Sequence, residues 1–287
     1  MSATRRIEHQ SEFGCWEMCR GEPAPGLRGY VREYTGWFEH MASPLCRREL
    51  PTEIVPVIIN FGAPIRIFEQ SDPTRWTDVD SFAAGPYDTY VLVGSAGPSG
   101  GVQINFTMLG ARLFLGRPLV DLTNRVVALD DLFGAGAERL RGELHDAGTW
   151  PARFAILDRE IGARISAARS LPPAVVWAWR RLTATGGRVS IGAIVADAGC
   201  SQKHFIAQFT EHIGLTPKVM SRVLRFGAAV DALKTRGARF RLADIAADCG
   251  YFDQAHFSRD FRAFAGVSPS ALLRAALPDE GGFAVTR

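Results

Sequence analysis

A repeat in the last hundred residues is the feature of this sequence that most constrains its fold. Three segments stand in the same order in two copies: residues 194–199 and 245–250, residues 204–209 and 256–261, and residues 214–217 and 266–269. The offset is 51 residues for the first pair and 52 for the other two, so the second copy has one extra residue in its turn. Matching segments in register predict two structurally similar units.

Each copy has the pattern of a short helix, a turn and a second helix. The first helix ends at a glycine that can adopt positive φ, Gly199 or Gly250, and the second begins at a capping residue, Ser201 or Asp253. A pair of phenylalanines four residues apart anchors the second helix to the core and leaves its other face free. This pattern indicates a helix-turn-helix, whose second, recognition helix suits the major groove of DNA.

The alternative to this interpretation is two helical hairpins in an ordinary bundle. The recurrence of the caps, the aromatic pair and the Gly-x-[Ser/Thr]-Pro segment favours the helix-turn-helix. Two such units joined by a rigid helix would present both recognition helices to one face of a duplex. If these helices enter successive major grooves, they must lie about 34 Å apart.

The charge distribution separates the repeat from the rest of the chain. Residues 1–173 carry 18 Lys and Arg against 21 Asp and Glu, whereas residues 174–277 carry 14 against 7. A basic segment beside a mildly acidic one suits a nucleic-acid-binding domain joined to another domain, although many basic domains bind no nucleic acid.

The chain is expected to be cytoplasmic. Its five cysteines are odd in number and scattered, which favours reduced thiols over a disulfide framework. No apolar stretch approaches the length of a membrane span, and no apolar core follows Arg5 and Arg6 as a secretory signal would require.

Two prolines at Leu171-Pro172-Pro173 end one helical pattern and open the next. We therefore expect a first domain over residues 1–171, a second over residues 172–278 and a tail over residues 279–287. Short apolar runs separated by Gly and Pro predict strands within about 45–108, and helices follow within about 109–170. The expected strands are residues 54–61, 65–68, 90–93 and 102–106. The predicted fold class is α+β: a small β-barrel or sandwich, then an all-α domain with two helix-turn-helix units and a linker helix.

Residues 247–261, ADCGYFDQAHFSRDF, followed by GVSP at 266–269, resemble the signature of AraC/XylS-type transcription regulators. The resemblance covers roughly residues 174–277. The first unit matches less closely, because Val195 stands where alanine is usual, and Ile206 and Ala207 stand where polar side chains are common. Base reading by the first unit would then be weaker or partly apolar.

The resemblance implies a regulator that is not an enzyme and that forms a homodimer. It would act as a transcription activator, which binds double-stranded DNA and contacts RNA polymerase. The resemblance also implies a separate domain that senses an unidentified small-molecule effector. Residues 37–106 would form its cupin-like β-barrel and residues 109–170 its helical dimerisation segment. No cofactor is expected.

The resemblance and helix geometry together nominate the DNA contacts. The candidates for base contacts are Gln202, Lys203, Ile206, Ala207, Gln254, Ala255, His256 and Arg259. Arg259 suits guanine and Gln254 suits adenine. The candidates for phosphate contacts are Ser201, Thr216, Arg222, Arg225 and Ser268. Arg259 could instead pair with Asp248 or Asp260, and His204 and His256 could be capping or packing groups.

Aromatic side chains in the first domain could enclose an effector pocket or simply fill a core. They are Trp37, Phe38, Phe61, Phe68, Trp76, Phe82, Tyr87, Tyr90 and Phe106. The string at Gly97–Gly101 matches a nucleophile elbow, but a strand pattern follows it, so we interpret it as a Gly-rich hairpin turn.

The six histidines form no metal-binding motif, so no metal site is expected. Cys15, Cys19 and Cys46 suggest an alternative function, a cysteine-dependent DNA alkylation repair or response protein, or a redox sensor, on the same DNA-binding domain. The missing fourth thiolate argues against zinc. Cys15 and Cys19, one helical turn apart, could simply be packed hydrophobes.

Overall fold

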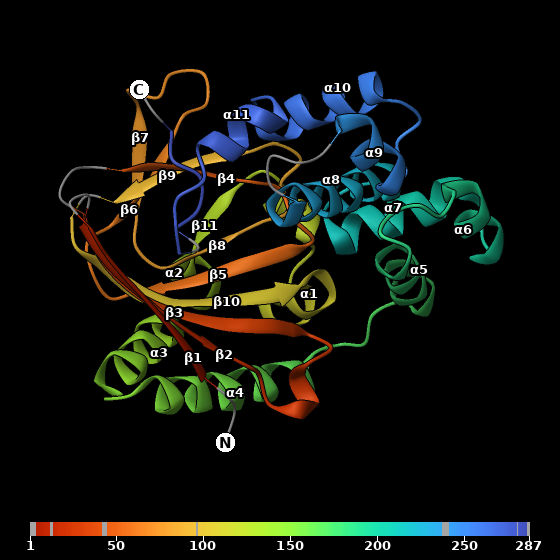
Figure 1. Ribbon diagram of the computed structural model, residues 1–287. Coiled ribbons are helices and arrows are strands. Elements are labelled where there is room, and N and C mark those ends of the chain that lie inside the picture. The colour runs from red at the N-terminus through yellow and green to blue at the C-terminus, as the bar shows by residue number, and fades with distance from the viewer. Residues whose placement is uncertain are drawn as a thin grey trace.

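The computed structural model describes residues 4–11, 14–41, 45–95, 97–236, 241–279 and 281–285. An N-terminal region of two sheets and several helices lies beside a C-terminal region of helices (Figure 1). The expected α+β class is therefore confirmed. Among the described residues, none of the helices combines the length and the apolar character needed to cross a bilayer.

Two antiparallel sheets form the N-terminal region. The larger has the order β1 (Thr4–Ser11), β2 (Gly14–Gly21), β3 (Val31–Met41), β10 (Ser99–Thr107), β5 (Ile54–Asn60), β8 (Phe82–Ala84) and β11 (Val126–Ala128). The smaller has the order β4 (Cys46–Glu49), β9 (Val91–Ser95), β6 (Ile65–Phe68) and β7 (Trp76–Val79). Neither order closes into a ring within the described residues, so the expected single barrel is instead two open sheets.

The expected strands are present, but the sheet region is larger than predicted. Strands were expected only from about residue 45, whereas β1, β2 and β3 precede that point and β11 interrupts the expected helical segment. β1 was missed because it is an edge strand with exposed, charged side chains. The glycine-rich turn joins β9 to β10, which lie in different sheets, so it is not a hairpin.

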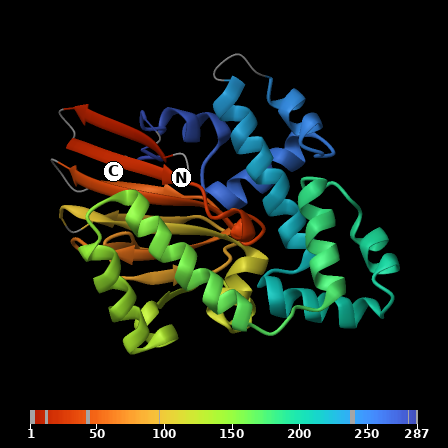
Figure 2. The ribbon, with the colours of Figure 1, turned by 90° about the horizontal axis from the view of Figure 1, so that it is seen from below.

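Helices cover the outer face of the larger sheet. α3 (Ala135–Asp146) and α4 (Trp150–Ala167) lie across it (Figure 2). Close approach depends on glycine, because a Cβ on Gly36 of β3 would lie 2.2 Å from the Trp150 ring. In chain order, α1 (Met108–Leu115), η2 (Leu119–Leu122) and α2 (Leu129–Phe133) lie between β10 and α3, and η1 (Pro25–Leu27) joins β2 to β3.

The described residues of the C-terminal region are helical as far as Arg274, and the tail after it forms two isolated β-bridges, Ala276 with Phe283 and Ala284 with Arg47 of β4. The helices of this region are α5 (Pro173–Ala184), α6 (Ile191–Asp197), α7 (Gln202–Ile213), α8 (Pro217–Arg236), α9 (Leu242–Asp248), α10 (Gln254–Ala265) and α11 (Pro269–Arg274). α8 connects the pair α6–α7 to the pair α9–α10 as the expected linker helix (Figure 1).

Candidate nucleic-acid interface

The first helix-turn-helix unit is built by α6 and α7. α6 begins after Ser190, whose hydroxyl accepts a hydrogen bond from the Ala193 amide at 3.0 Å. Gly199 supplies the left-handed turn with φ of 68°. Ser201 then caps α7 by accepting from the His204 amide at 3.3 Å. Phe205 and Phe209 are fully buried, which fixes the inner face of α7 and leaves its other face to solvent.

The second unit repeats this construction with different side chains. Gly250 adopts φ of 77°, and the Asp253 carboxylate caps α10 by accepting from the His256 amide at 2.6 Å. Phe257 and Phe261 are fully buried, as their counterparts in α7 are. Phe226 of α8 packs against Phe261 with ring centroids 5.1 Å apart. The repeat in the sequence therefore corresponds to two structurally similar units, as expected.

The side chains expected to contact bases lie on the recognition helices α7 and α10. Most are exposed: Gln202, Lys203, Ala207, Gln254, Ala255 and Arg259. Ile206 and His256 are half-buried, and the His256 ring lies against Tyr251 with centroids 5.4 Å apart. Arg259 is exposed, and no ion pair joins it to another residue that the structure describes.

Three of the expected phosphate contacts are helix caps. Ser201, Thr216 and Ser268 each accept a hydrogen bond from a backbone amide at 3.3 Å. Thr216 and Ser268 are half-buried, and each hydroxyl keeps its proton for another acceptor. They occupy matched places, each directly before the proline that opens α8 or α11.

Arg222 and Arg225 on α8 are half-buried, and each is hydrogen-bonded to another part of the C-terminal region. Arg222 donates to both oxygens of Asp260 on α10, at 3.1 and 2.9 Å, and these hydrogen bonds raise the pKa of its guanidinium. The Asp260 side chain is 8% exposed. Arg225 donates to the Gly187 carbonyl and the Ser221 hydroxyl, both at 3.2 Å. The partnership of Arg222 with Asp260 was not foreseen, since the two residues are 38 positions apart.

The N-terminal region contacts the C-terminal end of both recognition helices. At α7, the Thr123 hydroxyl donates to the Gly214 carbonyl at 2.7 Å. At α10, Arg48 of β4 donates to the Ala265 carbonyl at 2.6 Å and stacks on Tyr90, 4.2 Å from the ring centroid. Gly214 and Gly266 are the left-handed C-caps, with φ of 86° and 69°. The two contacts therefore fix where each recognition helix ends relative to the sheets.

A second contact near α7 carries a titratable group. Arg112 of α1 donates to Nδ1 of His212 at 3.2 Å, which requires that nitrogen to be unprotonated. Burial, and then the neighbouring Arg112 charge, lower the pKa of His212. The imidazole is therefore neutral at pH 7.

A cavity of about 580 Å³ lies between the two sheets. Of the expected aromatic residues, Trp37, Phe38, Phe82 and Tyr87 line it, while Phe106 is buried in the core. Burial raises the pKa of Tyr87 to about 12. Lys234 of α8 also reaches this cavity, so the linker helix forms part of its wall.

Glu49 of β4 has accessible surface, yet burial raises the pKa of its carboxyl. Both observations hold because its accessible surface faces the cavity between the sheets. Successive side chains of β4 point to opposite faces of the sheet. Arg47 and Glu49 line the cavity, and Arg48 between them points to α10.

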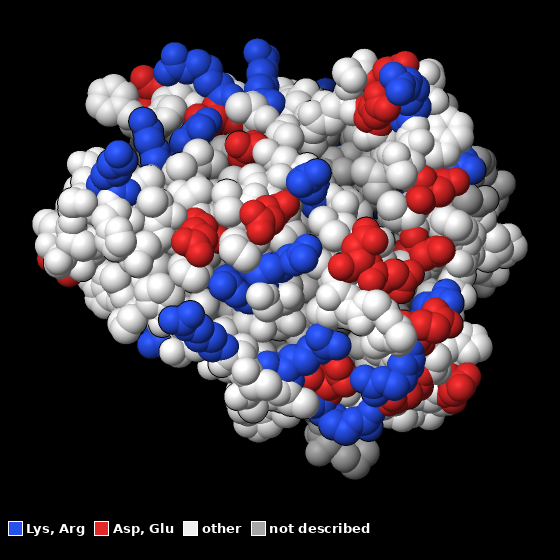
Figure 3. Space-filling model, turned by 180° about the vertical axis from the view of Figure 1, so that it is seen from behind, with Lys and Arg blue, Asp and Glu red and all other residues white. Residues whose placement is uncertain are grey.

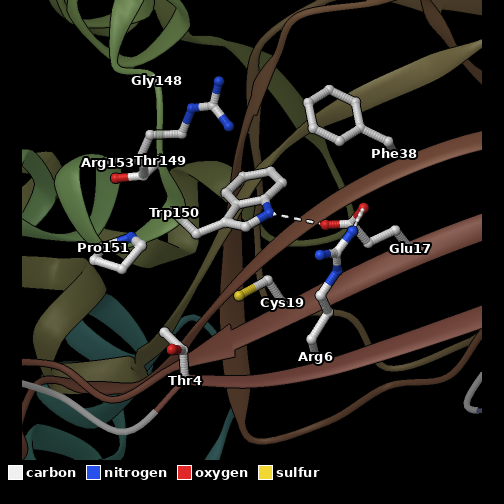
Figure 4. A pocket seen from close by; sticks show the side chains of 10 residues that line it. All are labelled: Thr4, Arg6, Glu17, Cys19, Phe38, Gly148, Thr149, Trp150, Pro151 and Arg153. Carbon is white, nitrogen blue, oxygen red and sulfur yellow. Dashed lines mark hydrogen bonds and ion pairs between the residues drawn. The ribbon is translucent and has the colours of Figure 1, made fainter.

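A cleft on the outer face of the larger sheet shows the setting of the cysteines. In this cleft of about 490 Å³, Trp150 donates to Glu17 at 3.1 Å beside the buried Cys19 (Figure 4). Cys15 and Cys19 lie on strand β2, so the spacing of one helical turn was a wrong interpretation. Burial raises the pKa of the Cys19 thiol, which disfavours the reactive thiolate. The described residues hold no cluster of His, Cys, Asp and Glu that could bind a metal.

Charge on the surface follows the division seen in the sequence. On the face shown in Figure 3, Lys and Arg predominate over the C-terminal helices, while the two signs are mixed over the N-terminal region.

Comparison with known proteins bears on the C-terminal helices. Residues 194–275 match a family model described as a helix-turn-helix domain. Over 87 residues the chain is 31% identical to YidL, an HTH-type transcriptional regulator of Escherichia coli K12. That match covers 30% of this chain and 29% of YidL, so it spans less than a third of the relative.

Solved structures resemble this chain at lower sequence identity. ToxT from Vibrio cholerae O395 aligns with 83% of this chain and 97% of its own, at 11% identity and a TM-score of 0.44. The C-terminal domain of AraT from Geobacillus stearothermophilus aligns with 39% of this chain and 93% of its own, at 20% identity and a TM-score of 0.35. The matched residues, with the paired caps and buried phenylalanines, support a helix-turn-helix domain of the AraC/XylS type over residues 194–275.

Proposed function

We propose that this protein is a sequence-specific, DNA-binding transcription regulator that reads DNA with α7 and α10. The observation that carries the proposal is the pair of recognition helices with equivalent caps, equivalent buried phenylalanines and solvent-exposed outer faces. The N-terminal residues of such helices approach base edges in the major groove. No catalytic step is needed for this function, which takes place where the DNA is, in the cytoplasm.

In α10, Arg259 suits a bidentate contact with guanine and Gln254 a contact with adenine. Both side chains are exposed: Arg259 lies on the helix face opposite the buried phenylalanines, and Gln254 lies in the first turn of α10. Ala255 and His256 complete this surface. In α7, Gln202 and Lys203 provide polar contacts, and Ile206 and Ala207 provide apolar ones. Ser201, Thr216 and Ser268 suit phosphate contacts, because each stands at a helix N-terminus.

Arg222 and Arg225 support the interface in a different way from the direct phosphate contact that their charge suggests. Arg222 pairs with Asp260 of α10 and Arg225 binds the Gly187 carbonyl before α6. The linker helix thereby connects to both units. We propose that these two arginines set the relative orientation of α7 and α10.

We further propose that a small-molecule effector binds in the cavity between the sheets. Its wall includes Lys234 of the linker helix and Glu49 of β4. Arg48, the neighbour of Glu49, binds the end of α10. An effector that moves β4 or Lys234 would therefore change the position of a recognition helix, which is the differential contact that ligand control requires.

The remaining parts of the proposal concern assembly. The two sheets would correspond to the cupin-like sensor, and α3 and α4 to the helical segment of a homodimer. RNA polymerase would be the partner of a DNA-bound activator.

The proposed function is tested by selecting 30-base-pair duplexes from a random library with the full-length protein. Fluorescence anisotropy then measures affinity for selected and scrambled duplexes at several salt concentrations. We expect selected duplexes to bind at least about 1,000-fold more tightly than scrambled ones, with a salt slope that indicates several phosphate contacts. Equal, weak binding to every duplex would contradict the proposal.

A further inference from the structure

Phe252 is the most exposed large apolar side chain among the described residues, with 92% of its surface accessible. The others that are more than a third exposed, Phe38, Trp76, Val120 and Trp177, reach at most 45%. Its counterpart in the first unit, Cys200, is half-buried. A phenyl ring left in water forgoes the free energy that burial would provide, so a contact with a partner outside the chain that covers it would be favourable.

The position of Phe252 places it at the DNA side of the second unit. It directly precedes Asp253, the N-cap of α10, and the exposed Gln254 and Ala255 follow. A recognition helix presents its N-terminal residues to the base edges. A side chain at the residue before the N-cap therefore lies beside the groove that α10 enters.

The surroundings of Phe252 fit DNA better than a second protein. Gly250, Asp253, Gln254 and Ala255 are all exposed, and none has a large apolar side chain. A stable protein interface needs a contiguous apolar centre within a buried area of about 1,000 Å² or more. A single ring amid small and polar residues does not supply one, but it is large enough for one apolar contact.

The base edges of the major groove offer one apolar group, the C5-methyl of thymine. A phenyl ring has no hydrogen-bond donor for a phosphate or for a purine. We propose that Phe252 is a specificity-determining residue that contacts a thymine methyl group in the half-site bound by α10. This inference rests on the proposed function and adds a base contact to it.

The proposal distinguishes Phe252 from the charged residues near it. An apolar contact releases no counterion, so removing the ring weakens binding to the selected duplex without changing the salt slope. It also leaves non-specific binding unchanged, because scrambled DNA does not hold the thymine in place. Folding is unaffected, since the ring packs against little of the protein.

The test uses full-length wild type, Phe252→Ala and the control Trp76→Ala, which removes a 45% exposed aromatic from β7 of the N-terminal region. We expect Phe252→Ala to bind the selected duplex about tenfold more weakly and scrambled duplexes equally well, at an unchanged melting temperature. Trp76→Ala should match wild type. A loss below twofold, or an equal loss on all duplexes, would overturn the inference.

Replacing thymines one at a time by deoxyuridine locates the contact, because only the methyl group is removed. One replacement should reproduce the tenfold loss in wild type and cause no further loss in Phe252→Ala. Additive losses at every position would overturn the inference while leaving the proposed function in place. A wild-type protein that selects no sequence would instead overturn both.

Discussion

The two helix-turn-helix units share a backbone plan but differ in how their recognition helices are held and in what they expose. α10 carries Arg259 on its outer face and is tied to the linker helix by the Asp260 ion pair with Arg222. α7 has the half-buried Ile206 and the exposed Ala207 at its outer face, and its end is held by the neutral Thr123 hydroxyl. Equal folds thus leave room for unequal roles, and we propose that α10 reads DNA specifically while α7 makes weaker, partly apolar contacts.

The largest expected effect comes from breaking the ion pair of the second unit. Asp260→Asn leaves the Arg222 guanidinium without its bidentate partner. Because the Asp260 side chain is 8% exposed while Arg222 is 32% exposed, we expect a loss of about 3 kcal/mol in the free energy of unfolding, the lower end for a broken buried pair. Urea unfolding measures this, with Asp231→Asn, an exposed carboxyl on α8, as the control. If the Asp260 variant were as stable as the control, the ion pair would not stabilise the second unit, and this difference between the two units would be contradicted.

The contacts at the C-terminal ends of α7 and α10 allow a matched test of the next largest effect. Arg48→Ala removes the hydrogen bond to Ala265 and the stacking on Tyr90, whereas Thr123→Val removes the hydrogen bond to Gly214. We expect each to cost about 1 to 2 kcal/mol, with Arg48→Ala the larger because its donor is charged. Amide hydrogen exchange should accelerate at the end of α10 in the first variant and at the end of α7 in the second. Acceleration at both helices in both variants would mean that the contacts are not separate.

The smallest expected effect is a pH dependence of the free energy of unfolding, which arises from His212 in the first unit. The pKa of His212 is lowered in the folded protein, mainly by burial and then by Arg112, so folding favours the neutral imidazole. The stability it contributes is fully present above the unfolded pKa of about 6.5 and is lost as pH falls through the folded value. Since the side chain is only half-buried, we expect less than about 1 kcal/mol.

Unfolding of wild type and His212→Gln between pH 5 and 7.5 measures this effect. Wild type should lose more stability on acidification than the variant, and parallel pH profiles would contradict the assignment.

The units were predictable from the sequence because their signals are local. Ser201 and Asp253 indicate helix starts, because their side chains can cap a helix. Gly199 and Gly250 indicate turns, because glycine can adopt positive φ. The repeat then supplies a second, independent copy of each signal. For the same reason, β6 at Ile65–Phe68 matches the predicted strand.

Other parts of the structure depend on contacts that the sequence does not display. β1 holds Ile7 as its single apolar residue, so no alternation marks it as a strand. The ion pair of Arg222 with Asp260 is not displayed by the sequence, because the two residues are 38 positions apart. The cavity is formed by strands from both sheets and by Lys234 of the linker helix, which no local pattern brings together.

The central claim is that α7 and α10 read adjacent segments of one duplex and that α10 contributes more specificity. Hydroxyl-radical footprinting of a selected duplex tests it directly, with wild type, Arg259→Ala and Lys203→Ala. We predict two protected segments about 10.5 base pairs apart on one face of the duplex. Arg259→Ala should weaken binding by about 10- to 100-fold and relax the preference at a guanine, while Lys203→Ala should cost less and lower the salt slope. A single protected segment, or a larger specific loss from Lys203→Ala, would contradict the account.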